Sequence, residues 1–170
     1  MKKDFSKDST CCFTGHRDIP RDEYMTTAEL LSRCAERLIL AGFNRFICGG
    51  ALGFDTVAAV SVINLREKYP DICLFMALPC PDQDIKWMQK DRIFYRKILE
   101  RADETVVLSD SYTKGCMMRR NRYMVDNSSV CICYVNKNSG GSFYTMNYAV
   151  NSGLRVINIA DMTKGGARNA

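Results

Sequence analysis

The chain has 170 residues, of which 46% are apolar and 25% charged, as is typical of a globular domain with a complete hydrophobic core. No apolar run approaches the ~20 residues that a membrane helix needs, and the polar stretch 1–9 lacks the apolar segment of a secretory signal. We therefore expect a cytoplasmic protein with no membrane partner. The net charge of +5 permits an anionic ligand without requiring nucleic acid.

Six short apolar runs predict buried strands, because most contain β-branched or aromatic residues. In chain order they are Thr10–Thr14, Arg45–Cys48, Ile72–Leu78, Thr105–Leu108, Val130–Val135 and Arg155–Ile159. The segments between them have helical character: Glu23–Ala41, Asp55–Tyr69, Asp84–Arg101, Met117–Asn127 and Ser142–Asn151. This alternation predicts an α/β fold, a Rossmann-like three-layer sandwich with a mostly parallel sheet of about six strands. We expect one domain over residues 1–170, with flexible ends at 1–9 and 162–170.

The cysteine pattern favours thiols over disulfides or a metal centre. There are nine cysteines, an odd number, and most lie inside the apolar runs. No two of them have the CxxC spacing of a zinc site. We therefore expect reduced, buried cysteines and no metal ligands.

In open α/β sheets, ligands bind beyond the carboxyl ends of the strands. The segments that follow the first five predicted strands are polar or rich in glycine: Gly15–Arg17, Gly49–Thr56, Pro79–Gln83, Ser109–Tyr112 and Asn138–Ser142. Because these loops meet at one edge of a parallel sheet, the sequence predicts a ligand site there.

Two of the loops are glycine-rich and lead into predicted helices. Such glycines let the backbone approach an anion, which the free N–H groups and the helix dipole then favour. The predicted phosphate contacts are Gly49, Gly50, Gly53 and Thr56 in one loop, and Gly140, Gly141, Ser142 and Thr145 in the other. The alternative is that the glycines only make tight turns. Neither loop has the Walker A or GxGxxG pattern.

Three polar residues near these loops have two interpretations each. His16, the single histidine, follows Gly15 and either contacts a phosphate or sugar or caps the next turn. Arg17 binds an anion or pairs with a neighbouring carboxylate. Asp55 caps its helix or accepts a hydrogen bond from a ribose hydroxyl. All are candidate ligand contacts.

Basic residues cluster at two further places. Arg119–Arg122 opens a predicted helix, where the dipole disfavours cations, so we expect an anion near Arg120 and Asn121. Trp87 lies on the strongly charged segment Asp84–Arg101, where it either stacks on a base or packs on a solvated helix.

The pattern Thr14–Arg17 followed by Gly49–Ala59 resembles the YpsA-like branch of the SLOG superfamily. That superfamily also contains the DNA-processing protein DprA (Smf) and the LOG "lysine decarboxylase-like" phosphoribohydrolases. The resemblance extends from about Thr10 to Ile159. It implies a Rossmann-like fold, a nucleotide-type ligand and, by analogy, a homodimer.

The two related groups imply different activities. DprA-like proteins have a glycine loop similar to Gly49–Asp55 and bind single-stranded DNA. LOG enzymes cleave the N-glycosidic bond of nucleoside monophosphates, and their signature resembles a set of residues here: Arg120, Met124, Ser128, Gly140, Gly141 and Thr145. Asn147 stands where these enzymes have an acidic residue, and asparagine cannot act as a carboxylate base. The candidate catalytic residues are then Arg120 with Asp126 or Asp55.

The leading interpretation is a domain that binds or senses a nucleotide derivative such as ADP-ribose, NAD or a nucleoside phosphate, with no required cofactor. The alternatives are a nucleotide N-glycosidic hydrolase and a DprA-like protein that binds single-stranded nucleic acid.

Overall fold

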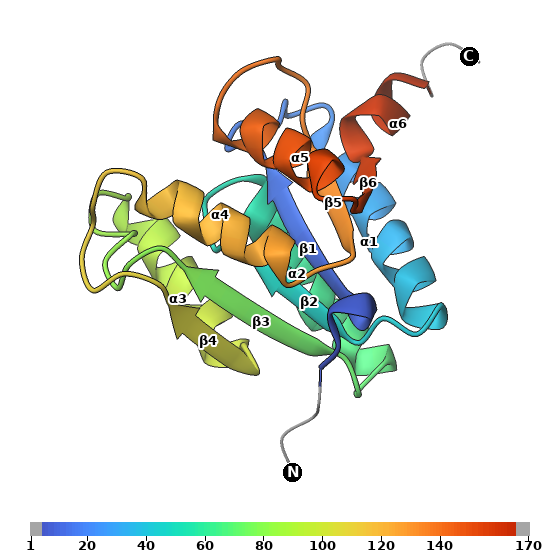
Figure 1. Cartoon of the computed structure of the whole chain (residues 1–170), viewed down its shortest axis with the longest axis horizontal. Helices are drawn as coiled ribbons and strands as arrows, with labels where there is room; N and C mark the ends of the chain where they lie inside the picture. The colour runs from blue at the N-terminus through green and yellow to red at the C-terminus, as the bar shows by residue number, and fades with distance from the viewer. Residues whose placement is uncertain (1–4, 166–170) are drawn as a thin grey trace.

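The computed structural model describes residues 5–165, with side chains for residues 5–164. Its centre is a six-stranded, all-parallel sheet with the strand order β4-β3-β2-β1-β5-β6 (Figure 1). The strands are β1 (Thr10–Gly15), β2 (Arg45–Cys48), β3 (Cys73–Leu78), β4 (Glu104–Val107), β5 (Val130–Tyr134) and β6 (Arg155–Asn158). The predicted Rossmann-like fold is confirmed.

The chain changes direction across the sheet at β1. From β1 it proceeds outward through β2 and β3 to β4, then crosses back to β5 on the other side of β1 and ends at β6. In β1, Cys12 lies opposite Ile47 of β2 on one side and Cys131 of β5 on the other. The gap beyond the carboxyl ends of β1 and β5 is thus a topological switch point, where ligands bind in folds of this kind.

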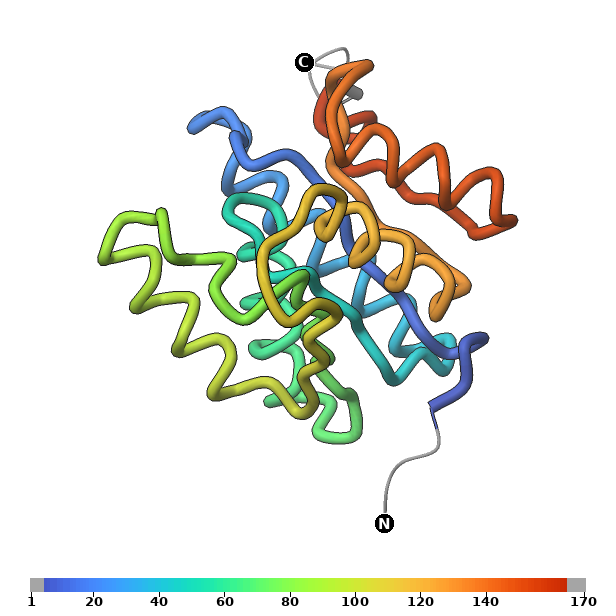
Figure 2. Tube along the Cα trace, turned by 60° about the vertical axis from the view of Figure 1, so that its left-hand side comes forward, coloured from blue at the N-terminus to red at the C-terminus, as the bar shows by residue number. Residues whose placement is uncertain are grey.

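Helices cover both faces of the sheet. The helices α1 (Tyr24–Leu40), α2 (Phe54–Lys68), α3 (Gln89–Arg101) and α6 (Ile159–Gly165) pack on one face, where they share a core cluster with alternate strand residues. The helices α4 (Cys116–Asp126) and α5 (Gly141–Asn151) lie side by side on the other face (Figures 1 and 2). This arrangement gives the three layers that the sequence predicts.

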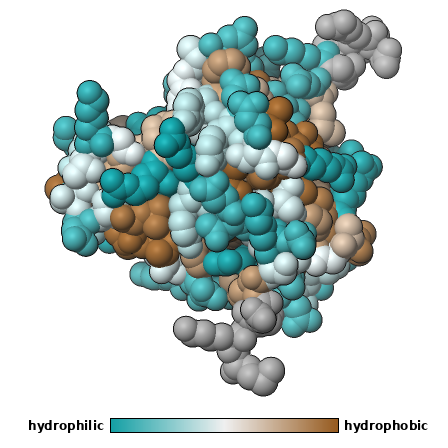
Figure 3. Space-filling view, in the orientation of Figure 1, coloured by the Kyte–Doolittle hydropathy of each residue, from teal (hydrophilic) through white to brown (hydrophobic). Residues whose placement is uncertain are grey.

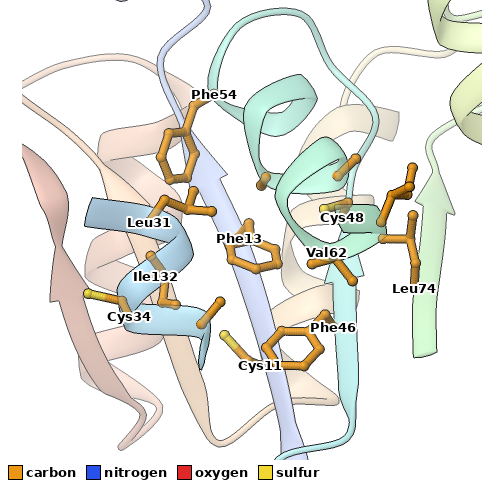
Figure 4. Packing of buried hydrophobic residues seen from close by; sticks show 14 of the residues in the cluster. Cys11, Phe13, Leu31, Cys34, Phe46, Cys48, Phe54, Val62, Leu74 and Ile132 are labelled. Carbon is orange, nitrogen blue, oxygen red and sulfur yellow. The ribbon is translucent and has the colours of Figure 1, made fainter. Parts of the chain in front are cut away.

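The cores follow from the alternation of side chains along each strand. In β1, Phe13 faces the larger cluster, where its ring stacks with Phe46 at a centroid distance of 6.1 Å. Leu31 of α1 and Val62 of α2 pack on the same cluster (Figure 4). Cys12 faces the opposite cluster. All nine cysteines are free thiols, and all are buried, as predicted.

Most boundaries agree with the prediction to within one residue, and two differ by more. The helix expected from Asp84 begins at Gln89, because residues 81–86 form turns and Met88 is extended. Asp84 is fully buried and accepts hydrogen bonds from Arg96, so it lies before the helix and binds one of its side chains. The flexible tail expected from residue 162 is partly helical, since α6 runs to Gly165.

The short α6 is held by side chains that the sequence pattern did not single out. Asn158 Oδ1 accepts from the N–H of Ala160 at 3.3 Å, and Ile159 is buried in the core. At the other end of the chain, Lys7–Ser9 form a 3₁₀ turn. The remaining residues of the two predicted flexible ends, 1–4 and 166–170, lie outside the described residues.

The surface over α4 and α5 is mostly hydrophilic (Figure 3). β4 is an edge strand, and its Val107 is exposed. Among residues 5–165, no helix is both long and apolar enough to cross a membrane. Within the same range, no three His, Cys, Asp or Glu side chains are grouped so that they could hold a metal ion.

Candidate functional site

A pocket of about 280 Å³ lies at the carboxyl ends of β1 and β5, and we call it the switch-point pocket. Its lining comes from the end of β1, from the loops after β1 and β2, and from the N-terminal parts of α2, α4 and α5: Thr14, Gly15, His16, Arg17, Ala51, Asp55, Met117, Arg120, Asn121, Gly141 and Ser142. Eight of these were predicted from the sequence. Its volume is near the lower limit of small-molecule sites.

The loop after β1 forms one wall of this pocket. The His16 N–H donates to the carbonyl of Tyr134 at 3.1 Å, and the His16 carbonyl accepts from the N–H of Phe54 at 3.2 Å. These bonds fix the loop between β5 and α2. His16 Nε2 is buried and has no hydrogen-bond partner among the described residues. Burial, together with nearby Lys137, lowers the pKa of His16, so the ring is neutral near pH 7.

Asp55 brings a carboxylate to the pocket from the first turn of α2. Its Oδ2 accepts from the N–H of Ala51 at 3.2 Å, and it makes no capping bond to the helix. Burial raises the pKa of Asp55 to about 6, although Arg120 and the Ala51 N–H oppose that rise. The predicted capping role is therefore not observed, and Oδ1 has no hydrogen bond to the described residues.

Arg120 is buried on α4 beneath the loop after β2. Its Nη1 donates to the carbonyl of Gly49, and its Nε donates to Asn121 Oδ1 at 2.8 Å. Burial lowers the pKa of Arg120, whereas the charge of Asp55 raises it. This guanidinium therefore holds the loop in place as well as adding positive charge to the pocket.

The start of α5 forms the opposite wall. Gly140 is the N-cap residue at φ +92°, and no side chain caps the helix. A Cβ at Gly140 or Gly141 would meet nothing within 4 Å, so the backbone is open to an approaching group. The Thr145 hydroxyl donates to the Gly141 carbonyl at 2.8 Å, so it bonds within the helix. The uncapped N–H groups at the start of α5 suit an anion.

The first glycine loop has a mainly structural role. Gly53 has φ +80°, and a Cβ there would lie 2.6 Å from Arg17 Cα, so only glycine lets the loops after β1 and β2 pack together. Gly49 and Gly50 do not line the switch-point pocket. The Thr56 hydroxyl donates to the Ala51 carbonyl at 3.1 Å. The two predicted glycine loops therefore have different roles. The loop before α5 is open to the pocket, and the glycines of the loop before α2 allow close packing against neighbouring segments.

Several predicted residues lie outside the pocket. Asp126 is at the far end of α4, exposed, and accepts from the Tyr148 hydroxyl at 2.8 Å. It therefore does not supply a carboxylate to this site. Ser128 is buried and donates to the Met124 carbonyl, which is a structural bond. Asn147 is exposed on α5.

A second pocket, of about 400 Å³, shares Arg17 with the first, and we call it the aromatic pocket. It is lined by Arg17, Asp18, Tyr24, Leu52, Gly53, Thr56, Trp87, Asp91, Phe94 and Tyr95. Of these, Arg17, Gly53, Thr56 and Trp87 were singled out from the sequence, whereas Tyr24, Asp91 and Phe94 were not. The spacing of Trp87, Asp91, Phe94 and Tyr95 within one short segment was the available signal.

The parallel sheet and its switch-point pocket place the chain among the Rossmann-like α/β domains. The YpsA model, that of the YspA SLOG family, matches residues 14–158, so the chain belongs to that family. Two relatives are an uncharacterized SPbeta prophage-derived protein, YoqJ, of Bacillus subtilis and a UPF0398 protein of Halalkalibacterium halodurans. YoqJ is 29% identical over 71% of this chain and 78% of its own length. The UPF0398 protein is 32% identical over 62% of this chain and 57% of its own length.

Solved structures show the same fold at low sequence identity. DNA processing protein A of Helicobacter pylori, which binds single-stranded DNA, is 16% identical with a TM-score of 0.62, over 97% of this chain and 75% of that one. The DprA of Streptococcus pneumoniae is also 16% identical, with a TM-score of 0.63, over 88% of this chain and 50% of that one. The resemblance expected from the sequence is confirmed.

Proposed function

We propose that the switch-point pocket binds the phosphate-bearing part of a nucleotide or nucleotide derivative, and that the chain is a binding or sensing domain. The observation that carries this proposal is the uncapped start of α5, which enters the pocket at Gly141 and Ser142. His16, with its unpartnered Nε2, and the exposed Arg17 line the same pocket. Backbone N–H groups and a guanidinium are complementary to a phosphate.

The other lining residues fit the sugar of such a ligand. Asp55 Oδ1 and the Asn121 side chain can accept hydrogen bonds from ribose hydroxyls. The buried Arg120 adds positive charge to the pocket. The ligand class is that of ADP-ribose, NAD or a nucleoside phosphate, and the proposal needs no metal or further cofactor.

A thermal-shift panel of ADP-ribose, NAD, AMP, ribose 5-phosphate and a short single-stranded DNA tests this function. A ligand that binds only the folded state raises the melting temperature by mass action. We expect at least one phosphate ligand to do so, and Arg17→Ala to abolish the shift. Arg21→Ala is the matched control, because Arg21 is exposed on the same loop and lines neither pocket. No shift from any phosphate ligand would overturn the proposal.

Asp55 favours a second candidate function, N-glycosidic hydrolysis of a nucleotide. The LOG-like signature has Asn147 in place of its acidic residue, and Asp55 provides a carboxylate inside the pocket. A carboxylate with a pKa of about 6 can stabilise an oxocarbenium-like transition state or accept a proton from water. Release of free base from AMP, lost in Asp55→Asn, would support turnover. Binding without release would restrict the domain to recognition.

The fold shared with the Helicobacter pylori protein favours a third candidate, the binding of single-stranded DNA. The basic side chains of α3 are only partly available for it, because Arg92 and Arg96 both contact the buried carboxylate of Asp84. Affinity for an oligonucleotide that falls steeply with salt, together with no response to mononucleotides, would favour this candidate. A homodimer, expected by analogy, remains a proposal that sedimentation would test.

A further inference from the structure

The aromatic pocket adjoins the switch-point pocket through the loop after β1. Arg17 lines both, and Gly53 and Thr56 line the aromatic side. A ligand that extends past Arg17 would therefore enter the aromatic pocket next. The two pockets differ in chemistry, so they suit different parts of one molecule.

Large aromatic surfaces are left uncovered at this pocket. Phe94 is 47% exposed and Tyr24 is 45% exposed, although both side chains line a cavity. Trp87 is half-buried and packs edge-to-face on Tyr95, with ring centroids 5.2 Å apart and an interplanar angle of 65°. Exposed rings around a cavity provide a platform on which a planar group can stack.

Tyr95, on which Trp87 packs, is linked to the glycine loop through Gln83. The Gln83 Nε2 donates to the Tyr95 hydroxyl at 2.8 Å and lies 3.4 Å from the carbonyl of Gly49. That carbonyl also accepts from Arg120, which lines the switch-point pocket. The Gly49 carbonyl therefore connects Tyr95 of the aromatic pocket, through Gln83, with Arg120 of the switch-point pocket. These bonds fix the position of one pocket relative to the other.

Charge separates the roles of the two pockets. The switch-point pocket has two guanidinium groups, Arg17 and Arg120, and one carboxylate, Asp55. The aromatic pocket has two carboxylates, Asp18 and Asp91, and only the shared Arg17. A phosphate is repelled by the aromatic pocket, whereas carboxylates accept hydrogen bonds from exocyclic amino groups.

We propose that the aromatic pocket is the nucleobase subsite of the ligand whose phosphate lies in the switch-point pocket, and that it prefers a base with an exocyclic amino group, such as adenine. This inference rests on the proposed function. It names Tyr24, Trp87 and Phe94 as the stacking residues, and Asp18 and Asp91 as the acceptors that select the base.

Trp87 makes the test direct, because it is the single tryptophan of the chain. Adenosine, AMP, uridine and ribose 5-phosphate are titrated while Trp87 emission and the melting temperature are followed. Adenosine and AMP should change the emission along a saturating curve, and uridine should do so more weakly. Ribose 5-phosphate should raise the melting temperature and leave the emission almost unchanged.

A pair of variants separates stacking from folding. Phe94→Ala should lower the affinity for AMP about tenfold, as expected when one stacking ring is lost. It should leave the affinity for ribose 5-phosphate unchanged. Tyr112→Ala is the matched control, since Tyr112 is 68% exposed and lines neither pocket. An equal loss for AMP and ribose 5-phosphate in Phe94→Ala would overturn the proposal.

The outcomes distinguish this inference from the proposed function. If ribose 5-phosphate binds but neither adenosine nor AMP changes Trp87 emission, the base subsite is wrong and the phosphate site stands. If adenosine changes the emission but ribose 5-phosphate does not bind, the phosphate assignment fails and the base subsite is supported. Equal responses to adenosine and uridine would overturn the selection by Asp18 and Asp91.

Discussion

Arg120 and Gly49 are packed so closely that a side chain at residue 49 would overlap the guanidinium. A Cβ there would lie 2.6 Å from Arg120 Cζ, and the carbonyl of Gly49 accepts a hydrogen bond from Nη1. Because Gln83 approaches the same carbonyl, this one peptide group joins the end of β2 to α4 and to the aromatic pocket. The glycine is required by close approach and not by ligand contact.

Gly49→Ala should therefore destabilise the fold. Overpacking against a buried arginine costs about 1–3 kcal/mol of unfolding free energy. Urea denaturation would measure this as a lower midpoint with an unchanged slope. Gly141→Ala is the control, because a Cβ at Gly141 meets nothing within 4 Å. Equal midpoints for Gly49→Ala and the wild type would contradict the assigned packing.

Arg120→Ala should be destabilising by roughly 2–4 kcal/mol, because it removes a buried donor from the Gly49 carbonyl and opens a gap under the loop. Its neighbour Arg119 is exposed and donates a hydrogen bond to the Ser109 hydroxyl, and its replacement by alanine should change stability by less than about 0.5 kcal/mol. Thermal unfolding of the two variants would show the contrast. If both variants have the melting temperature of the wild type, Arg120 does not stabilise the fold, and the structural role assigned to it is wrong.

The sequence predicted the sheet because six apolar runs alternate with helical segments, and it predicted the site because polar loops follow the strands. It could not distinguish the roles of the two glycine loops. Gly53 and Gly141 both lie at the start of a helix that follows a glycine loop. Their roles differ because Arg17 packs against Gly53, whereas the space around Gly141 is open. Tyr24 and Phe94 of the aromatic pocket were not predicted, since they are distant in sequence and only the fold brings them together.

Asp55 should make stability depend on pH. Burial raises its pKa in the folded state from 3.8 to about 6, so the folded protein keeps a proton that the unfolded chain releases. The free energy of unfolding of the wild type should then fall, relative to that of Asp55→Asn, as the pH rises from about 4 to about 7. The total change has an upper limit on the order of 3 kcal/mol. Urea titrations of both proteins across this range would measure it, and parallel curves would contradict the raised pKa.

The cysteines should be unreactive until the protein unfolds. All nine are buried, and burial raises the pKa of Cys11 and Cys48, so little thiolate forms at neutral pH. A chromogenic disulfide reagent should modify the native protein slowly and all nine thiols at once in denaturant. Rapid modification of a native thiol would show that one of the cores opens easily.

Binding of a phosphate at the start of α5 is best tested with Gly141→Leu. A Cβ at residue 141 would meet nothing within 4 Å, so we expect the variant to fold with a melting temperature close to that of the wild type. Isothermal titration calorimetry with the phosphate ligand that gives the largest thermal shift would then compare the two proteins. We expect Gly141→Leu to bind this ligand at least tenfold more weakly than the wild type, a loss of about 1.4 kcal/mol in binding free energy. A folded variant with wild-type affinity would contradict it.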